Sequence, residues 1–410
     1  MTKMKDTPPR GAFSPRADIC VLGGAGHVGL GISIVLASKG KRVLILDVNT
    51  AAMESIRSGC MPFLEFDAEP VLKQALESGN LLFSSDVAEI ASVPIIMVTI
   101  GTPIDEFLNP DMKDFVRCFE EMLPYLSDEH LLILRSTVYP GMTEWLDRFV
   151  AGKGLHPRIA FCPERIVEGH AVRELQVLPQ IVSGTTPEAE ESASEVFSWI
   201  APSIVRLKPM EAEFAKLFAN AYRYIQFATT NQFYMMANSA GLDYYRILEG
   251  IKHDYPRLRD IPKAGYAAGP CLLKDTMQLT AFSNNRFSLG YSAMMINEGL
   301  PLYVVSQLEQ KYALREKTVG ILGMAFKADS DDPRTSLSYK LKKLLKLRAK
   351  QVLTTDPLVR HDSELAPLEE VLDRSDILIL GVPHSAYRDI NIQGKPVVDI
   401  WNFLGKSSLI

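Results

Sequence analysis

The stretch Asp18–Gly29, DICVLGGAGHVG, decides the fold of the N-terminal part of the chain. A strand-like run leads into a G-x-G-x-x-G turn at Gly24, Gly26 and Gly29, and a helical pattern follows. The first glycine allows the sharp bend, the second lets a pyrophosphate approach the backbone, and the third lets the helix pack on the strand. Asp47 ends the next strand, where a carboxylate accepts hydrogen bonds from ribose hydroxyls. The pattern therefore predicts a dinucleotide site, and the acid favours NAD over NADP.

Short apolar runs alternate with helix-like stretches through the first 208 residues. The helix-like stretches include residues 69–78 and 114–126. The strand-like runs are residues 18–22, 42–47, 93–100, 131–136, 158–162 and 180–183. Because strands that alternate with helices form parallel sheets with crossover helices, we expect a mainly parallel, doubly wound sheet here.

A long helical section begins near residue 209. Residues 210–248 and 272–308 have a helical period, and the loop between them is rich in glycine and proline. Strand and helix patterns alternate again from residue 317. We therefore expect an α/β fold in which two doubly wound Rossmann-like domains are joined by a central all-helical section with a long helix. The expected parts are a disordered lead-in (1–16), an NAD-binding Rossmann domain (17–208), a central helical domain (209–310) and a second Rossmann-like domain (311–410).

The composition excludes several classes of protein. The 410 residues are 47% hydrophobic and 23% charged, which is ordinary for a globular chain. A net charge of −5 argues against a nucleic-acid-binding protein. No apolar run approaches the roughly 18 residues of a membrane span, and residues 1–18 lack the apolar core of a secretory signal. We expect a cytoplasmic protein that binds neither nucleic acid nor membranes.

The cysteines form no recognisable framework. They are odd in number, none are spaced as C-x2-C, and the seven histidines do not cluster, so neither disulfides nor a metal site is expected. Four are interpreted as buried small hydrophobes with reduced thiols. These four are Cys20, Cys60, Cys118 and Cys162.

Cys271 is the exception among the cysteines. It ends the glycine-rich run GYAAGPC at the point where a helical pattern begins. A helix N-terminus and the nearby Lys274 would both favour the thiolate of a nucleophile. Asp275 follows four residues after the cysteine and would share its helix face.

Polar residues also interrupt the apolar pattern of the long helix. Glu213, Lys216 and Asn220 fall on one side of it, at i, i+3 and i+7. They could form a solvated face with an ion pair, but a partly buried lysine would suit the stabilisation of an oxyanion. A second acidic motif, PERIVEG, follows a predicted strand, so Glu164 and Glu168 would face the ligand crevice of the sheet.

A series of further motifs runs through the chain in a fixed order. They are GTPIDE, RSTVYPG, PERIVEG, EFAKLFANAY, GPCLLKD, LGMAFKADSDDPRTS and TDP. With the glycine turn, this set resembles the UDP-glucose/GDP-mannose dehydrogenase family from about residue 18 to 401. The resemblance implies NAD-dependent four-electron oxidation of the C6 alcohol of a nucleotide sugar through a cysteine thiohemiacetal and thioester, for polysaccharide biosynthesis. It also implies a homodimer through the central helices and a C-terminal domain that binds the sugar nucleotide.

The resemblance assigns catalytic roles to individual residues. Cys271 would be the nucleophile, and Asp275 would orient or activate water. Lys216 and Asn220 would stabilise oxyanions. Glu164 would act as the acid/base of thioester hydrolysis. A sixth residue, which would hold water near Glu164, is Thr137.

The resemblance also implies binding roles. The residues that fall where the family contacts NAD are Gly24, Gly26, His27, Val28, Gly29, Asp47, Thr102, Glu168, Lys274 and Arg334. The residues expected at the substrate are Gly269 and Lys327. An arginine between the long helix and the cysteine loop, Arg257 rather than Arg259, would reach the substrate of a neighbouring subunit.

The identity of the sugar depends on the cysteine loop. The run YAAGPC departs from the G-F-G-G-x-C form that is usual in the family, and the G-G-H-C form that is more frequent in enzymes of 2-acetamido sugars is absent. The pair Lys274-Asp275 resembles the branch that acts on UDP-glucose or GDP-mannose. We therefore expect UDP-glucose, with UDP-ManNAc, UDP-GlcNAc or GDP-mannose as alternatives. Two remoter alternatives are a two-electron hydroxyacid-type dehydrogenase, which needs no cysteine, and a non-catalytic NAD-binding protein.

Overall fold

The computed structural model describes residues 16–267, 269–392, 394–405 and 410. The expected lead-in therefore lies outside the described residues, except for Arg16. The chain divides into two compact units, with the boundary between Leu217 and Phe218.

The first unit contains an eight-stranded sheet in the order β3-β2-β1-β4-β5-β6-β7-β8. The strands are β1 (Ile19–Leu22), β2 (Val43–Leu46), β3 (Leu81–Ser84), β4 (Ile95–Val98), β5 (Leu131–Leu134), β6 (Arg158–Phe161), β7 (Gln180–Gly184) and β8 (Ile204–Arg206). Neighbours are parallel except for β6 and β7, which are antiparallel. This topology confirms the mainly parallel, doubly wound sheet. Two strands were not predicted from the sequence, β3 and β8, which are short edge strands with incompletely buried side chains.

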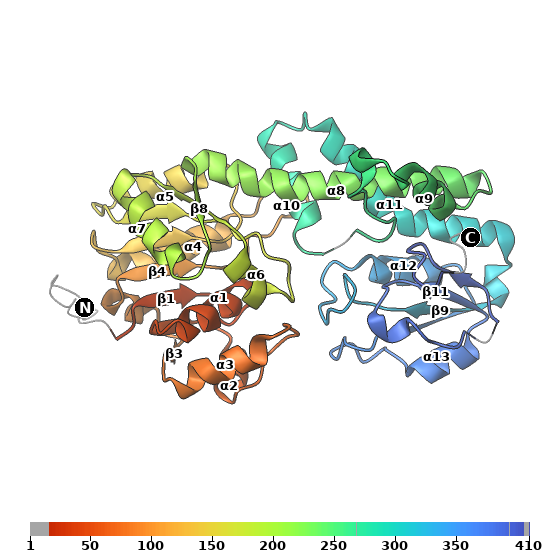
Figure 1. The fold of residues 1–410 in the computed structure, drawn as a ribbon, viewed down its shortest axis with the longest axis horizontal. Helices are drawn as coiled ribbons and strands as arrows, with labels where there is room; N and C mark the ends of the chain where they lie inside the picture. The colour runs from red at the N-terminus through yellow and green to blue at the C-terminus, as the bar shows by residue number, and fades with distance from the viewer. Residues whose placement is uncertain (1–15, 268, 393, 406–409) are drawn as a thin grey trace, which may run out of the picture. The chain divides into compact units, whose positions relative to one another are not determined.

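Helices cover both faces of this sheet (Figure 1). One face packs against α1 (His27–Ser38), α2 (Thr50–Arg57), α3 (Ala68–Glu77), α6 (Ala171–Val177) and α7 (Pro187–Ser198). The other packs against α4 (Lys113–Met122) and α5 (Met142–Ala151). The side chains alternate between the two cores, since Ile19 and Val21 enter one and Cys20 enters the other. Burial on both faces explains why these strands read as continuous apolar runs.

The second unit contains a four-stranded parallel sheet in the order β10-β9-β11-β12. The strands are β9 (Thr318–Leu322), β10 (Gln351–Thr355), β11 (Ile377–Leu380) and β12 (Val397–Val398). Two helices, α11 (Ser288–Lys311) and α12 (Leu337–Lys346), contribute to the core on one face, and α13 (Leu368–Arg374) covers the other. The second α/β domain that the sequence predicted is therefore confirmed.

The central helices are shorter than expected. The run expected over residues 210–248 is interrupted, because α8 (Pro209–Ser239) ends before Gly241, whose φ is +70°, and α9 (Tyr244–Lys252) starts after its N-cap, Asp243. The run over 272–308 also breaks, into α10 (Leu272–Phe282) and α11. Asn284 and Asn285 make this turn at φ values of +52° and +61°, which asparagine tolerates better than most residues.

Short 3-10 helices complete the described secondary structure. They are η1 (Val87–Ser92), η2 (Leu123–Tyr125), η3 (Pro256–Leu258), η4 (Leu314–Glu316) and η5 (Ser385–Tyr387). Within the described ranges, no helix combines the length and hydropathy that crossing a membrane requires.

Candidate active site

The glycine turn between β1 and α1 has the shape of a phosphate cradle. A Cβ atom on Gly29 would overlap the carbonyl oxygen of Gly23, and a Cβ on Gly24 would lie 2.7 Å from a backbone oxygen of β1. Gly26 is the N-cap of α1, and the first turn of that helix contains no acidic residue. Asp47 lies just past β2 and accepts the Ala25 N–H at 2.9 Å. A helix N-terminus without acids, beside an anchored carboxylate, fits a dinucleotide.

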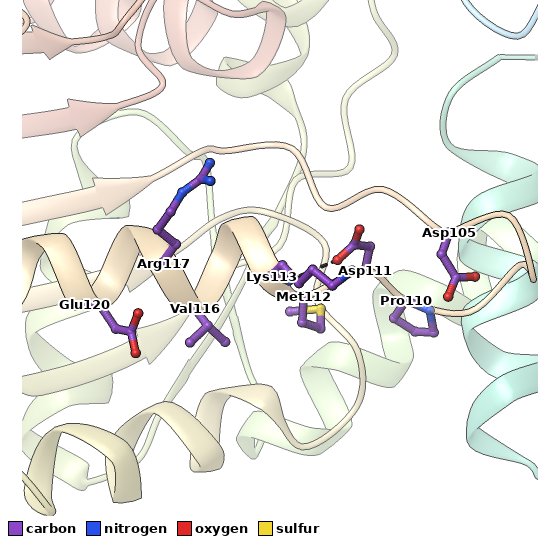
Figure 2. A pocket seen from close by; sticks show the side chains of 8 residues that line it. All are labelled: Asp105, Pro110, Asp111, Met112, Lys113, Val116, Arg117 and Glu120. Atoms are coloured by element: carbon purple, nitrogen blue, oxygen red, sulfur yellow. Dashed lines mark hydrogen bonds between the residues drawn. The ribbon is translucent and has the colours of Figure 1, made fainter.

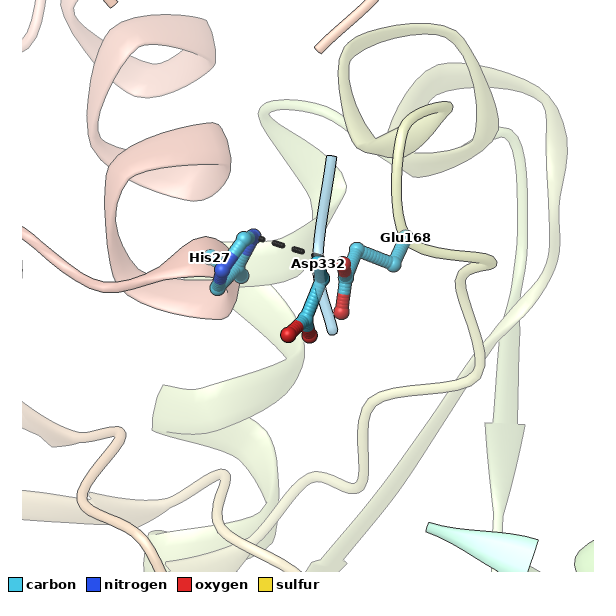
Figure 3. Close-up of side chains that lie close together, drawn as sticks. All are labelled: His27, Glu168 and Asp332. Atoms are coloured by element: carbon cyan, nitrogen blue, oxygen red, sulfur yellow. Dashed lines mark ion pairs between the residues drawn. The ribbon is translucent and has the colours of Figure 1, made fainter. Parts of the chain in front are cut away.

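His27 and Val28 are the first residues of α1, and His27 meets another predicted residue. Its Nδ1 lies 3.7 Å from Oε1 of Glu168, which comes from the loop after β6 (Figure 3). The imidazole also stacks on Phe63, with ring centroids 3.9 Å apart. The fold therefore joins the glycine turn to the PERIVEG loop. Phe63 gave no sequence signal, because an isolated aromatic residue in a loop has no distinguishing pattern.

Glu164 occupies a buried site at the start of the same loop. Arg135, which is fully buried, forms an ion pair with its carboxylate. The other carboxylate oxygen accepts the backbone N–H groups of Arg165 and Ile166 at 2.6 and 2.8 Å. Arg135 also donates to Gln180 at 3.1 Å. This role of Arg135 was not predicted from the sequence, although the residue belongs to the RSTVYPG motif. The predicted acid would thus act from a fixed and charge-compensated position.

Thr102 and Thr137 are brought together at the carboxyl edge of the first sheet. The hydroxyl of Thr102 donates to the carbonyl oxygen of Thr137. The neighbouring Ser136 hydroxyl donates to the Ile100 carbonyl at 2.6 Å. These contacts tie the loop after β4 to the loop after β5, so both threonines lie where ligands bind in such sheets.

Glu213 and Lys216 are both buried near the start of α8. The Glu213 carboxylate accepts the N–H groups of Gly141 and Thr143 at 2.6 and 2.9 Å and the Thr143 hydroxyl at 2.6 Å. Burial raises its pKa, an effect that these hydrogen bonds oppose. The alternative of a solvated face with an ion pair is therefore wrong. Glu213 caps the N-terminus of α5 and joins it to α8.

Cys271 lies at the N-cap of α10 and is exposed to solvent. One turn later, Asp275 is 0% exposed. The side-chain amide of Asn220, from α8, donates to Asp275 Oδ2 at 2.6 Å. Lys274 Nζ lies 2.9 Å from the other carboxylate oxygen. The fold therefore brings four of the predicted residues of the second unit to the start of α10: an exposed thiol at the N-cap and, one turn later, a buried carboxylate held by an amide and an ammonium group.

Apart from Arg257, the remaining predicted residues of the second unit lie on two loops, the one before α10 and the one between β9 and α12. Gly269 has a φ of +106°, and a Cβ there would lie 2.6 Å from the Phe326 ring. Lys327 Nζ lies 5.7 Å from the centroid of that same ring. Arg334 pairs with the carboxylate of Asp332, with Nε 2.8 and 3.0 Å from its two oxygens.

Arg257 lies in η3 and is exposed, as is Arg259. Arg257 donates to the Tyr255 hydroxyl at 3.1 Å. Neither arginine is brought to Cys271 by a contact within the described part of the second unit, so the contact with a neighbouring subunit stays a prediction.

Of the four cysteines predicted to be buried, only two are. Cys20 and Cys162 are buried, and burial raises the pKa of the Cys162 thiol to about 12. Cys118 is partly buried, and burial likewise raises its pKa to about 12. Cys60 is exposed, which corrects the expectation, because it lies in the turn after α2 rather than under a helix. Two thiols are thus accessible, those of Cys60 and Cys271.

A surface hollow of about 540 Å³ lies elsewhere in the first unit (Figure 2). It is lined by Asp105, by residues 110–113 and by Val116, Arg117 and Glu120 of α4. None of the predicted site residues lines it. The candidate site is therefore defined by side-chain contacts and not by this hollow.

The glycine turn, the carboxylate after β2 and the doubly wound sheet define the class of a dinucleotide-binding oxidoreductase. Three family models match in order: the NAD binding domain over residues 17–201, the central domain over 210–299 and the UDP binding domain over 320–406 of the UDP-glucose/GDP-mannose dehydrogenase family. The chain belongs to the UDP-glucose/GDP-mannose dehydrogenase family. It is an NAD-dependent nucleotide-sugar dehydrogenase, as the sequence motifs predicted.

Individual relatives are similar over nearly the whole chain. A UDP-N-acetyl-D-mannosamine dehydrogenase from Pyrococcus horikoshii is 27% identical over 95% of this chain and 92% of its own length. An NDP-N-acetyl-D-galactosaminuronic acid dehydrogenase from Ralstonia nicotianae is 25% identical over 92% of this chain and 94% of its own. The solved structure of a UDP-glucose dehydrogenase from Pyrobaculum islandicum is 28% identical, covers 96% of both chains and has a TM-score of 0.86.

Proposed function

We propose that this enzyme oxidises the C6 alcohol of UDP-N-acetylmannosamine to the uronic acid. The two relatives compared by sequence are named for N-acetylated sugars, and the family model over the C-terminal domain is a UDP-binding one. The expected preference for UDP-glucose is not confirmed. The relatives support the 2-acetamido alternative better, although a UDP-glucose dehydrogenase shares the fold.

The exposed thiol of Cys271 at the N-cap of α10, one helical turn before the buried Asp275, is the observation that carries the proposed chemistry. Bound NAD supplies the hydride acceptor for both two-electron oxidations. Cys271 forms its S–C bond with the C6 carbon of the aldehyde, giving a thiohemiacetal whose oxidation leaves a thioester. Water then breaks the S–C bond, so that the carboxylate leaves and the thiol is restored. Each sugar therefore consumes two NAD and yields two NADH.

The other predicted catalytic residues would stabilise the charges and move the protons of this reaction. The amide of Asn220 and the ammonium group of Lys216, one turn earlier on α8, would act on the oxyanions that form at C6. Asp275 is held by Asn220 and Lys274 and would orient water or receive its proton. Glu164, fixed by Arg135, would exchange the proton during hydrolysis, with Thr137 holding the water.

The binding residues keep the roles that the motifs predicted. Gly24, Gly26 and Gly29 would hold the pyrophosphate of NAD, and Asp47 its ribose. His27, Val28, Thr102, Glu168, Lys274 and Arg334 would complete this site. Lys327 and Gly269 would contact the nucleotide sugar, and Arg257 would approach from a neighbouring subunit.

A second copy of the chain is the proposed partner of the central helices. Phe218, Tyr222, Phe233 and Met236 of α8 are all exposed. At 100° per residue, these four side chains fall within about 60° of one another around the helix. Such an apolar stripe is typical of a protein interface, so it supports the predicted homodimer. Sedimentation should show a dimer that Met236→Glu dissociates, whereas a monomeric wild-type protein would contradict the dimer.

A screen of NADH production tests the substrate and the chemistry together. The panel is UDP-ManNAc, UDP-GlcNAc, UDP-glucose, UDP-galactose and GDP-mannose. We expect UDP-ManNAc to be preferred about a hundredfold in kcat/KM, which corresponds to about 2.7 kcal/mol of barrier. Preference for UDP-glucose would overturn the proposed substrate, and one NADH per sugar would overturn the four-electron reaction.

Replacement of the thiol tests the nucleophile. Cys271→Ser should abolish acid formation while NAD still binds. Cys60→Ser is the matched control, because Cys60 is the other exposed thiol among the described residues and lies in the turn after α2. Full activity of Cys271→Ser would contradict the covalent mechanism.

A further inference from the structure

The loop that leads to Cys271 begins with an unusual pairing between a side chain and the backbone. Asn231, on α8, accepts the Gly265 N–H at Oδ1 at 2.8 Å and donates from Nδ2 to the Gly265 carbonyl at 3.0 Å. The side-chain amide therefore binds both polar groups of one residue, as a neighbouring β-strand would do. Asn231 is 0% exposed, so water cannot replace these bonds.

A second asparagine fixes the orientation of the first. Asn297, on α11, accepts the remaining N–H of the Asn231 amide at 2.9 Å and donates to the Tyr224 carbonyl at 3.0 Å. Asn297 is also 0% exposed. The Asn297 amide group donates to the Tyr224 carbonyl, so the Asn297 side-chain oxygen faces Asn231 and accepts from its Nδ2. With Nδ2 placed in this way, Asn231 presents both Nδ2 and Oδ1 to the backbone of Gly265. Two helices thus determine the position of one loop residue.

The other side of Gly265 is closed by an aromatic ring. Its φ is +154°, and a Cβ atom there would overlap the Trp401 ring. The next residue, Tyr266, is buried, and its ring meets Trp401 edge to face at a centroid distance of 6.5 Å. Gly265 therefore sits between the Asn231 amide and Trp401, six positions before Cys271. The start of the loop is fixed on both sides.

We propose that Asn231 is a positioning residue for the nucleophile: by holding Gly265 it places Cys271 at the start of α10. The inference rests on the proposed function only in taking Cys271 as the nucleophile. Loss of the amide leaves the buried N–H and C=O groups of Gly265 without partners, and the loop must shift to satisfy them. The thiol would then lose its position at the N-terminus of α10, which favours its reactive form.

The test compares two thiols within one protein. Iodoacetamide is added to the full-length enzyme, and mass spectrometry follows the alkylation of Cys271 and of Cys60, which lies in the first unit and serves as an internal reference. Asn231→Ala should lower the Cys271 to Cys60 rate ratio at least fivefold. It should also lower kcat at least tenfold, with KM for NAD within twofold of the wild type.

Asn238→Ala is the matched control. Asn238 is a buried asparagine on the same helix, but it contacts the Tyr303 hydroxyl and the Ile410 N–H instead of the cysteine loop. An equal rate ratio in the two variants would overturn the proposal, because general destabilisation would then explain both. Should Asn231→Ala not fold, Asn297→Ser should shift the ratio in the same direction by a smaller factor, and an unchanged ratio there would also overturn it. Alkylation needs no substrate, so the rate ratio can be measured whether or not the enzyme turns over a nucleotide sugar. If the wild-type enzyme oxidised none of the substrates tested, the proposed function would be contradicted and the alkylation result would still be valid.

Discussion

The side-chain amide of Asn220 donates a hydrogen bond of 2.6 Å to the carboxylate of Asp275, 55 residues later in the chain. The carboxylate is completely buried, and Lys274 lies 2.9 Å from its other oxygen. Two polar groups from different helices therefore hold one buried charge, one helical turn after the exposed Cys271.

Removal of the amide should impair catalysis more than folding. Asn220→Ala leaves one carboxylate oxygen of Asp275 without its donor and removes a proposed oxyanion contact. We expect kcat to fall about 10²–10³-fold, the usual cost of losing one such donor. NADH production under saturating substrate measures it, and the NAD dissociation constant should stay unchanged. A loss confined to KM would show that Asn220 acts in binding and not on the oxyanion.

Removal of one partner of the buried Arg135–Glu164 ion pair should lower the free energy of unfolding. Arg135→Met leaves the Glu164 carboxylate buried without its cation, and such a change costs about 3–5 kcal/mol. Urea unfolding followed by the fluorescence of Trp145 and Trp199, both in the first unit, measures the loss. The double variant Arg135→Met/Glu164→Gln should recover part of the stability. If the double variant were as unstable as the single one, packing and not charge would be the cause.

The glycine turn should tolerate no side chain at Gly29. Gly29→Ala places a Cβ against the Gly23 carbonyl and must open the turn. We expect NAD affinity to fall at least tenfold in calorimetry. Gly299→Ala is the control, because a Cβ on this glycine of α11 meets no atom within 4 Å. Unchanged NAD affinity in Gly29→Ala would show that the turn does not hold the cofactor.

Asp356 should make folding stability depend on pH in the acid range. Burial alone would raise its pKa, but hydrogen bonds from His384 and from the Met324 and Val359 N–H groups lower it to about 2, from an ordinary 3.8. The Asp329 N–H donates to His384 Nδ1, so Nε2 carries the proton that faces Asp356.

A lowered folded-state pKa means that the stabilisation is complete above pH 3.8 and is lost as the pH falls through about 2. The contribution is roughly 2 kcal/mol. His384→Gln should raise the pKa of Asp356 and move this loss to higher pH, as seen in urea unfolding between pH 5 and 2. Identical pH profiles of the variant and the wild type would refute the role of His384.

The parts of the molecule that could be predicted from the sequence depend on local patterns. The alternation of apolar runs with helix-like stretches predicted the first sheet. The spacing of Gly24, Gly26 and Gly29 predicted the turn between its first strand and helix, because each glycine meets a local steric requirement. Cys271 could be placed at a helix start for the same reason, since a glycine-rich run meets a helical period there.

The parts that could not be predicted depend on partners distant in sequence. Arg135 reaches Glu164 only because β5 and β6 are neighbours, and Phe63 reaches His27 only through the loop after α2. In the sequence, Asn231 is one of several polar residues in a long helical run. Its pairing with Gly265, 34 residues later, depends on the fold. The edge strands and the helix breaks were missed because their sequences carry weak apolar or turn signals.

Each sheet has an aspartate directly after its second strand in chain order, Asp47 after β2 and Asp356 after β10. The two carboxylates differ in how many hydrogen bonds they accept. Asp47 accepts one backbone N–H on each oxygen, from Ala25 and Asn49, whereas Asp356 accepts from five donors: four backbone N–H groups and His384. A carboxylate has about four lone-pair sites, so Asp47 keeps acceptor capacity and Asp356 is saturated. A ribose hydroxyl could therefore donate to Asp47 but not to Asp356. The same position after the second strand thus serves ligand binding in the first sheet and only local structure in the second.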